Sequence, residues 1–309
     1  MGKTLKAVCI MGPTASGKSA LAVDLARQAP FEIVSVDSVQ VYSGLDIGSA
    51  KPDSELMAEI PHHLIDVRDP GHPYSASDFR KDAIELVREI VGRGRIPLLS
   101  GGTMLYFKAL KQGLADLPSA DETIRQKFAD FAAESGWPAL HERLAVVDPV
   151  SAARINPNDP QRLQRALEVY EITGKSMTEL QVQATRPCPF KLLEIAVIPP
   201  DRAELHQTIE KRFRHMLTRG LVEEVEQLYV RDDLNPSLPA IKAVGYRQVW
   251  DYLAGNTDYD TMVERAITAT RQFAKRQFTW LRSWQDLRQI DSPKRSEALK
   301  ILQADSILG

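Results

Sequence analysis

A short loop near the N-terminus constrains the fold of this chain more than any other segment. Residues 12–19 read Gly-Pro-Thr-Ala-Ser-Gly-Lys-Ser, which matches the phosphate-binding loop pattern of two glycines with four residues between them, followed by Lys and Ser. An apolar run at 7–11 precedes the loop, and an amphipathic helical pattern around Leu21 and Leu25 follows it. The sequence therefore predicts a strand, a phosphate loop and a helix in succession.

This loop predicts a site for a diphosphate or a polyphosphate. Backbone amides and the helix N-terminus surround phosphate oxygens in such loops, a lysine supplies a mobile positive charge, and a serine hydroxyl can hold Mg²⁺. The pattern does not say which phosphate compound binds. The predicted diphosphate-binding residues are Gly12, Pro13, Thr14, Ala15, Ser16, Gly17, Lys18 and Ser19, and Ser19 is also the predicted metal ligand.

Further short apolar runs alternate with helical patterns along the chain. They lie at Phe31–Val36, 63–66, 96–100 and 192–198. Strands that alternate with helices favour a parallel sheet with helices on both faces. We therefore predict an α/β fold with a P-loop NTPase-like parallel sheet core. After the last of these strands the pattern is mostly helical, beginning at an Asp201 cap.

The stretch 119–187 differs from the rest, because helical patterns follow one another there without a convincing strand. Ser119 and Glu122 predict a capping box at its start, and a later helix is predicted to begin at Asp159 and to end at Gly174. We predict a helical insertion domain in this stretch. Ordinary connecting helices are the alternative.

Composition is that of a packed globular protein. The 309 residues amount to about two domains, and we assign 1–118 and 188–309 to the P-loop core with its C-terminal helices. Hydrophobic residues make up 43% and charged residues 26%, which argues against a disordered chain. The formal net charge of -2 neither supports nor excludes RNA binding, which would need a local basic surface.

Compartment and membrane association follow from the apolar runs and the cysteines. The N-terminal run is too short for a signal peptide or a membrane span, which need apolar cores of about 7–15 and about 20 residues. Cys9 and Cys188 have no paired ligand spacing, which fits a reducing cytosol without a zinc site or a disulfide. We expect a cytoplasmic protein with no membrane partner.

Two polar segments follow predicted strands and are expected to meet. Asp37 ends the second strand, and Thr103 follows the strand at 96–100. Both should therefore project into the crevice at the carboxyl ends of the strands, near the phosphate loop. Asp37 could hold a metal, act as a general base or cap a following helix. The strand that ends at Ser100 offers no carboxylate for Mg²⁺, which weakens an ordinary ATPase interpretation.

Several separated motifs, in this order, resemble the bacterial tRNA dimethylallyltransferase family. The similarity runs from the phosphate loop to about Arg282. Ser19 and Ser49 stand where threonine would also be expected. Besides the loop, the motifs are DSVQVY at 37–42, DIGSAKP at 46–52, HHLID at 62–66, GGTMLY at 101–106, NDPQRLQRALEVYEITGKS at 158–176 and KAVGYRQ at 242–248.

The resemblance implies an enzyme that transfers a dimethylallyl group from dimethylallyl diphosphate to the exocyclic amine of the adenine 3′-adjacent to the anticodon of tRNA. The phosphate loop would then hold the prenyl diphosphate instead of ATP, with Mg²⁺ as cofactor. Positive charge there would stabilise the diphosphate leaving group. By the same resemblance, Asp37 would accept the proton of the amine and Thr103 would contact the reacting region.

Positive side chains on a predicted helix provide candidate contacts with the anticodon stem-loop. Arg162 and Arg165 lie one turn apart, although a solvated helix face is the alternative. Cations between Arg265 and Arg282 are further candidates, because that stretch contains no acidic residue. The full set of predicted tRNA-binding residues is Asp37, Ser38, Val39, Gln40, Thr103, Arg125, Gln161, Arg162, Leu163, Gln164, Arg165, Lys242, Ala243, Val244, Gly245, Tyr246 and Arg247.

Three rival functions share parts of this pattern. A prenyltransferase that acts on free adenylate would share the phosphate loop but would not need the helix with Arg162 and Arg165. A small-molecule kinase would share the loop and Mg²⁺ and would release ADP. A non-catalytic RNA-binding regulator would share only the basic stretches. We expect a monomer that binds tRNA and the prenyl diphosphate.

Overall fold

The computed structural model describes residues 5–115, 117–183, 187–291 and 293–308. The chain forms two compact units. The first, here called the core unit, combines Met1–Lys111 with Pro189–Gly309, and the second, the helical unit, is Gln112–Cys188. The insertion was expected at 119–187, inside the range of the helical unit.

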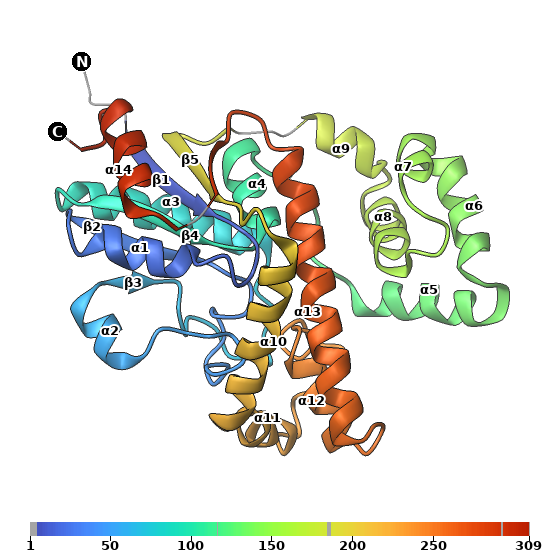
Figure 1. Ribbon diagram of the computed structural model, residues 1–309. Coiled ribbons are helices and arrows are strands. Elements are labelled where there is room, and N and C mark those ends of the chain that lie inside the picture. Colours follow the sequence, from blue (N-terminus) through green and yellow to red (C-terminus); the bar gives the residue numbers. More distant parts are fainter. Residues whose placement is uncertain (1–4, 116, 184–186, 292, 309) are drawn as a thin grey trace. The chain divides into compact units, whose positions relative to one another are not determined.

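A parallel sheet forms the centre of the core unit (Figure 1). Within the described residues it has six strands in the order β3-β2-β4-β1-β5-β6, and the paired strands run parallel. The predicted P-loop NTPase-like α/β fold is confirmed. The strands are β1 (Lys6–Met11), β2 (Phe31–Val36), β3 (His62–His63), β4 (Ile96–Gly101), β5 (Lys191–Val197) and β6 (Arg288–Ile290).

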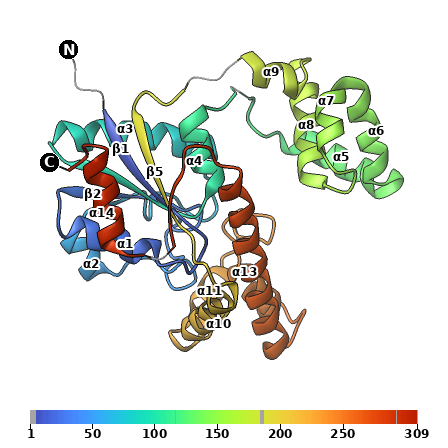
Figure 2. The same ribbon diagram turned by 45° about the horizontal axis from the view of Figure 1, so that its top comes forward.

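Helices cover both faces of this sheet (Figure 2). On one face, Leu21 and Leu25 of α1 pack with Leu302 of α14 against the apolar side chains of the strands. Helices α3 and α4 lie on the other face. The bounds of the helices near the sheet are α1 (Lys18–Ala26), α2 (Ser54–Glu59), α3 (Ala76–Gly92), α4 (Met104–Gln112) and α14 (Arg295–Ala304).

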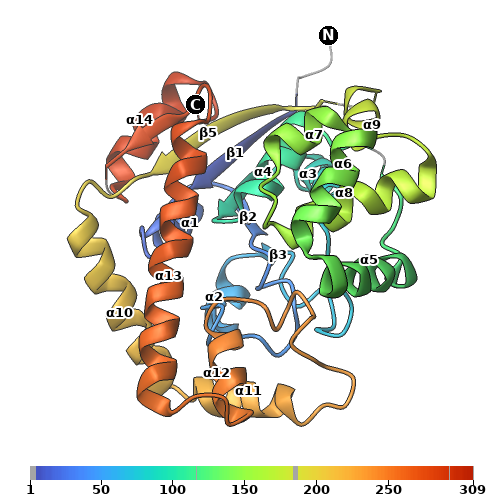
Figure 3. The same cartoon turned by 90° about the vertical axis from the view of Figure 1, so that its right-hand side faces the viewer.

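Two long helices, α10 and α13, run side by side beyond the carboxyl ends of the strands (Figure 3). Helix α10 begins after Asp201, which accepts hydrogen bonds from the backbone N–H groups of Ala203 and Glu204, so the predicted cap is confirmed. The bounds are α10 (Arg202–Thr218), α11 (Leu221–Tyr229), α12 (Tyr246–Leu253) and α13 (Tyr259–Arg282). Among the described helices, none is both long and apolar enough to cross a membrane.

One strand prediction was wrong, and one strand was missed. The third strand was expected at 63–66 but ends at His63, because Leu64 and Asp66 adopt φ values of 60° and 54°, which belong to turns rather than strands. Strand β6 was not expected at all. It is a three-residue edge strand that pairs with β5, and two of its residues have exposed polar side chains, so the sequence there contains no apolar run.

The helical unit has its own hydrophobic core, built around Phe128, Leu144 and Leu163. Its fourth helix begins after Asp159 and ends at Gly174, as predicted. The capping box predicted at the start of the helical unit is wrong. Asp121 rather than Ser119 caps the first helix of the unit and accepts a hydrogen bond from Ile124 N. The described helices are α5 (Glu122–Ser135), α6 (Trp137–Val147), α7 (Pro149–Arg154), α8 (Pro160–Thr173) and α9 (Met177–Gln183).

Candidate functional site

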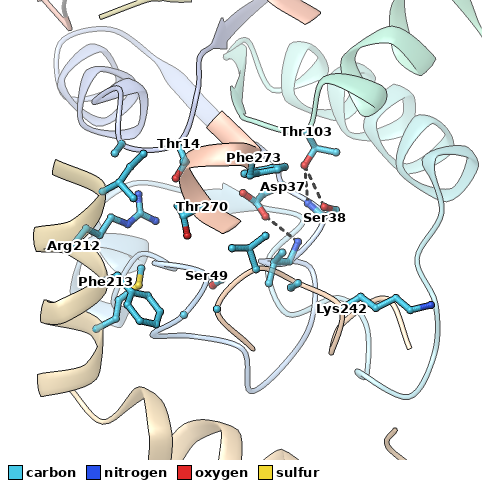
Figure 4. A pocket seen from close by; sticks show the side chains of 18 of the residues that line it. Thr14, Asp37, Ser38, Ser49, Thr103, Arg212, Phe213, Lys242, Thr270 and Phe273 are labelled. Carbon is cyan, nitrogen blue, oxygen red and sulfur yellow. Dashed lines mark hydrogen bonds between the residues drawn. The ribbon is translucent and has the colours of Figure 1, made fainter. Parts of the chain in front are cut away.

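A cavity of about 370 Å³ lies in the core unit, where the phosphate loop and the segments after β2 and β4 meet α10 and α13 (Figure 4). We call it the reaction cavity. It brings together predicted site residues that are far apart in the sequence. Those that line it are Thr14, Ala15, Asp37, Ser38, Val39, Thr103, Lys242, Ala243, Val244 and Gly245.

Asp37 faces this cavity directly after β2 (Figure 4). One carboxylate oxygen, Oδ1, accepts hydrogen bonds from Val39 N at 2.8 Å and Gln40 N at 3.3 Å. The following residues form turns, so the alternative of a helix cap was wrong. These bonds orient a carboxylate at the edge of the cavity.

Thr103 ties the two strand-end segments to each other. Its Oγ1 accepts a hydrogen bond from Ser38 N at 3.0 Å and donates one to Ser38 Oγ at 3.3 Å. Its backbone N–H donates to Val36 O at 3.2 Å, at the end of β2. The side chains of Asp37 and Thr103 therefore belong to one hydrogen-bonded corner of the cavity, which the strand pattern predicted.

Two cations lie near Asp37. Lys18 donates a hydrogen bond from Nζ to Pro13 O at 3.1 Å. Burial and the nearby charge of Arg212 lower the pKa of Lys18 to about 8, against the opposing effect of the Asp37 carboxylate. Arg212, on α10, lines the cavity, and burial lowers its pKa as well. This excess of positive charge favours an anionic ligand.

Sequence reasoning missed Arg212. Helical periodicity places it on the packed side of α10, three residues after Ile209 and seven after Leu205, but does not show which surface that side packs against. Only the packing of α10 over the ends of the strands shows that its guanidinium faces Thr14 and Asp37 rather than solvent (Figure 4).

The phosphate loop contains a buried hydroxyl that suits an anion. Ser16 is 4% exposed, and within the described residues its Oγ has no hydrogen-bond partner. An unpaired buried hydroxyl costs about 1–3 kcal/mol unless a ligand or water bonds to it. Its position in the loop fits a phosphate oxygen as that partner.

Ser19, the predicted metal ligand, does not line the reaction cavity in the described structure. It is exposed at the start of α1 and borders a separate hollow of about 360 Å³, together with Gln40, His62 and Ser100. Gln40 is held there, because its side chain accepts a hydrogen bond from Ser35 Oγ and donates to the carbonyl groups of Ser49 and Ala50. No cluster of three or more His, Cys, Asp or Glu residues suited to a metal occurs in the described part of the chain.

A carboxylate from α11 shapes the wall of the cavity at Gly48. Glu224 accepts hydrogen bonds from the backbone N–H groups of Asp46, Ile47 and Gly48, and from the hydroxyl of Tyr246 at 2.6 Å. A Cβ on Gly48 would lie 2.6 Å from the Tyr246 ring, so glycine is required there. The DIGSAKP and KAVGYRQ motifs therefore form one structural unit.

Tyr246 is fully buried in this unit. Its side chain is therefore not on the surface, and its contact with tRNA stays a prediction. Lys242 and Arg247, from the same motif, are exposed. A basic contact with a nucleic acid is therefore possible only at these two flanking positions of the segment, and Tyr246 positions the cavity wall.

The buried Lys51 side chain connects two further sequence motifs. Its side chain is 4% exposed and makes ion pairs with Asp46 and Asp66, and it donates to Tyr42 O at 3.0 Å. These contacts join the DIGSAKP segment to the HHLID segment. His62 and His63 do not form a metal site with other residues in the described structure, and His63 bonds instead to Glu32 at 2.8 Å.

The remaining predicted tRNA-binding residues lie in the helical unit. Two of them are arginines that donate hydrogen bonds to a buried carboxylate. Glu168 is fully buried and accepts hydrogen bonds from Arg125 at 2.9 Å, Arg165 at 2.6 Å and Asp121 N at 2.8 Å. Arg165 also donates to Pro118 O at 2.7 Å. Arg125 and Arg165 are therefore structural side chains with only partly exposed guanidinium groups.

Other residues of this helix divide between core and surface. Leu163 is fully buried in the core of this unit, so its side chain is not on the surface, and its contact with tRNA stays a prediction. Gln164 donates to Arg125 O at 2.7 Å. Gln161 is exposed, and the side chain of Arg162 is 71% exposed, so these two present polar groups to solvent.

Removing the carboxylate of Glu168 is expected to destabilise the helical unit. Burial raises the pKa of Glu168, but the hydrogen bonds from Arg165, Asp121 and Arg125 outweigh it and lower the pKa below its ordinary value. This stabilisation is present above the pKa of the unfolded state and is lost as pH falls through the lower folded value. Glu168→Ala should cost about 3 kcal/mol near neutral pH, measured by urea unfolding.

The exposed Glu171, on the same helix, provides the control for that measurement. Glu171→Ala removes a surface ion pair with Lys127, which contributes about 0–1 kcal/mol. Equal losses in the two variants would contradict a structural role for the buried carboxylate.

The fold and the reaction cavity together define an α/β P-loop enzyme whose phosphate loop and Asp37 carboxylate line the same cavity. A family model described as IPP transferase (IPPT) matches residues 40–284, and the chain belongs to this family. It is therefore an enzyme that transfers a prenyl group, and the predicted class is confirmed.

Solved structures agree with this assignment. A full-length tRNA isopentenylpyrophosphate transferase from Bacillus halodurans is 36% identical, with a TM-score of 0.69, over 98% of this chain and 95% of that one. A tRNA delta(2)-isopentenylpyrophosphate transferase from Staphylococcus epidermidis is 32% identical, with a TM-score of 0.67, over 98% and 99%. A eukaryotic dimethylallyltransferase acting on tRNA is 26% identical, with a TM-score of 0.76, over 98% and 79%.

Proposed function

We propose that this protein transfers the dimethylallyl group of dimethylallyl diphosphate to the exocyclic amine of the adenine 3′-adjacent to the anticodon in tRNA and releases diphosphate. The observation that carries the proposal is a cavity lined by Thr14 of the phosphate loop, by Arg212 and by the Asp37 carboxylate, with the buried ammonium of Lys18 close to both charges. The family and the tRNA-modifying relatives support the choice of substrates.

The diphosphate group would occupy the phosphate loop. In the transfer, the bond between the allylic carbon and the diphosphate oxygen breaks and its electron pair stays on the oxygen. Lys18, Arg212, the loop amides and the unpaired hydroxyl of Ser16 would stabilise that growing negative charge. Apolar side chains in the cavity wall, such as Phe213 and Phe273, would exclude water from the allylic carbon.

The acceptor adenine would enter beside the strand-end corner. Its exocyclic nitrogen forms the new bond to the allylic carbon and loses a proton, which the Asp37 carboxylate accepts. Hydrogen bonds from Val39 N and Gln40 N hold that carboxylate in place. Thr103 and Ser38 provide hydroxyl groups beside it.

The residues of the loop fit Mg²⁺ as a cofactor. Mg²⁺ takes hard oxygen ligands and usually keeps several waters, with substrate phosphates and one or two protein groups completing its shell. The exposed Ser19 hydroxyl at the start of α1 could provide a protein ligand. When bound, Mg²⁺ would neutralise charge on the diphosphate leaving group.

Basic side chains of both units would bind the anticodon stem-loop. In the helical unit, this role falls to Arg162, with the neutral amide of Gln161 beside it, and in the core unit to Lys242 and Arg247. We assign the helical unit to tRNA contact, and the core unit to the prenyl diphosphate and to the part of the tRNA that contacts Lys242 and Arg247. The enzyme would act as a monomer in the cytoplasm.

Affinity for inorganic diphosphate should decrease as pH rises through about 8, the pKa of Lys18, because only the charged ammonium attracts the anion. Lys18→Arg keeps its charge throughout this range and should lack this step. The ratio of the two affinities, measured by calorimetry across pH, cancels the ionisation of the ligand itself. A constant ratio would contradict a titrating Lys18 in the site.

Arg162→Ala is expected to weaken tRNA binding and to reduce the slope of log affinity against log salt by about one, because one phosphate contact is lost. Affinity for the prenyl diphosphate should stay unchanged. Fluorescence binding titrations over a salt series measure both quantities. Lys191→Ala removes an exposed lysine of the core unit and serves as the control. Binding and a salt slope equal to those of the parent would show that Arg162 belongs only to a solvated face.

One assay tests the function as a whole. The protein is incubated with dimethylallyl diphosphate, Mg²⁺ and unmodified tRNA, and prenyl incorporation and diphosphate release are measured, with AMP as a competing acceptor. Incorporation into tRNA supports the proposal. Incorporation into AMP alone would identify an adenylate prenyltransferase. In a parallel incubation with ATP, release of ADP would identify a kinase.

A further inference from the structure

One buried amide on α13 joins two loops of the reaction cavity. Gln277 is 3% exposed, and its Oε1 accepts a hydrogen bond from Thr14 N at 2.9 Å. Its Nε2 donates to Gly102 O at 2.8 Å. Thr14 belongs to the phosphate loop after β1, and Gly102 precedes Thr103 after β4. A single side chain therefore connects the phosphate loop to the segment that contains Thr103.

The space around this amide is closed. A Cβ on Gly102 would lie 2.5 Å from Gln277 Nε2, so the backbone approaches the amide more closely than any side chain would permit. On the same turn of α13, Phe273 and Arg276 line the cavity, whereas Gln277 is not part of its described lining. Gln277 therefore lies behind the cavity wall and acts on its loops rather than on a ligand.

A glutamine at this position is unusual for its surroundings. On α13 it follows the buried Ala274 and precedes the buried Leu281 on the packed face of the helix, where an apolar side chain would be expected. Only a group that accepts and donates at once can satisfy both Thr14 N and Gly102 O. Leaving either of them unpaired inside the protein would be costly.

We propose that Gln277 is a positioning residue that fixes the distance between the phosphate loop and the segment containing Thr103. This inference rests on the proposed function, because that distance sets how far the allylic carbon lies from the acceptor amine. A displacement of about 1 Å between reacting groups can lower a rate by about 10²-fold. Gln277 thus aligns the two substrates without touching either.

The experiment compares Gln277→Met, which removes both hydrogen bonds at similar size, with Gln303→Met, the same change at an exposed position of α14. Amide hydrogen exchange is measured at Thr14 and at residues 102–103, alongside kcat, KM for the prenyl diphosphate and Kd for tRNA. In Gln277→Met, exchange at Thr14 should accelerate and kcat should fall by about 10- to 100-fold, with an unchanged tRNA Kd. Gln303→Met should match the parent.

Gln277→Glu is expected to give kcat a pH dependence that would be absent if residue 277 only filled space. An ionised carboxylate can accept from Thr14 N but cannot donate to Gly102 O, whereas a protonated carboxyl can do both. Burial raises the pKa of such a carboxyl. The ratio of kcat in Gln277→Glu to kcat in the parent should therefore rise as pH is lowered from about 8.5 to about 6.

Unchanged exchange at Thr14 in folded Gln277→Met would overturn the inference, and so would an unchanged kcat. If Gln277→Met does not fold, a flat pH ratio for Gln277→Glu overturns it instead. A parent enzyme that transfers no prenyl group would contradict the proposed function. In that case the exchange at Thr14 alone decides whether Gln277 fixes the loop.

Discussion

Asp37→Asn is expected to slow single-turnover prenyl transfer by about 10²-fold or more, with tRNA binding nearly unchanged. Asparagine keeps the size of aspartate, and its carbonyl oxygen can still accept the hydrogen bonds from Val39 N and Gln40 N that orient the side chain. It cannot accept the proton of the adenine amine. Rapid-quench kinetics with enzyme in excess measure the chemical step directly.

The same variant separates a chemical role from a structural one. If Asp37 only stabilises the turn after β2, the substitution should lower the melting midpoint slightly and leave the rate constant close to that of the parent. Asp232→Asn, at an exposed position of the same unit, controls for the loss of one negative charge. A normal rate in Asp37→Asn would remove the carboxylate from the mechanism.

Lys18→Met and Arg212→Met are each expected to lower kcat/KM for the prenyl diphosphate by about 10²- to 10³-fold, because each removes a positive charge that stabilises the negative charge developing on the diphosphate leaving group. The two losses should not add in the double variant, since both cations act on one diphosphate at short range. Steady-state kinetics at limiting prenyl diphosphate provide the measurement.

Lys211→Met is the matched control, because it removes an exposed positive charge next to Arg212 on α10. It should retain the activity of the parent. Similar losses in Lys211→Met and Arg212→Met would show that overall charge rather than the cavity-facing guanidinium matters. Full activity of Lys18→Met would remove the phosphate loop from the substrate site.

Local patterns made the phosphate loop and the ends of β2 and β4 predictable. The loop lies between a strand and a helix that are adjacent in sequence, and Asp37 follows directly from the buried β2. Parallel strands end at the same edge of a sheet, so the meeting of Asp37 and Thr103 followed from sequence alone. The hydrogen bonds between Ser38 and Thr103 agree with that expectation.

Residues whose role depends on packing between distant elements were not predictable. Arg212, Glu224 and Gln277 lie in the C-terminal half, and each acts on a loop near the N-terminus. Helical periodicity gives the buried face of a helix, but not which surface it packs against. Whole motifs were assigned to tRNA, and these include Leu163 and Tyr246, whose side chains are buried.

The order of strands in the sheet has a consequence for synthesis on the ribosome. Strand β1 pairs with β4 on one side and with β5 on the other, and Lys6 faces Lys191 in that second pair. The helical unit is translated between β4 and β5, so the edge of β1 that pairs with β5 stays without its partner for about 9–36 seconds at about 5–20 residues per second. An open edge of this kind invites pairing with other chains. We therefore expect the nascent core, but not the helical unit, to depend on chaperones until β5 emerges.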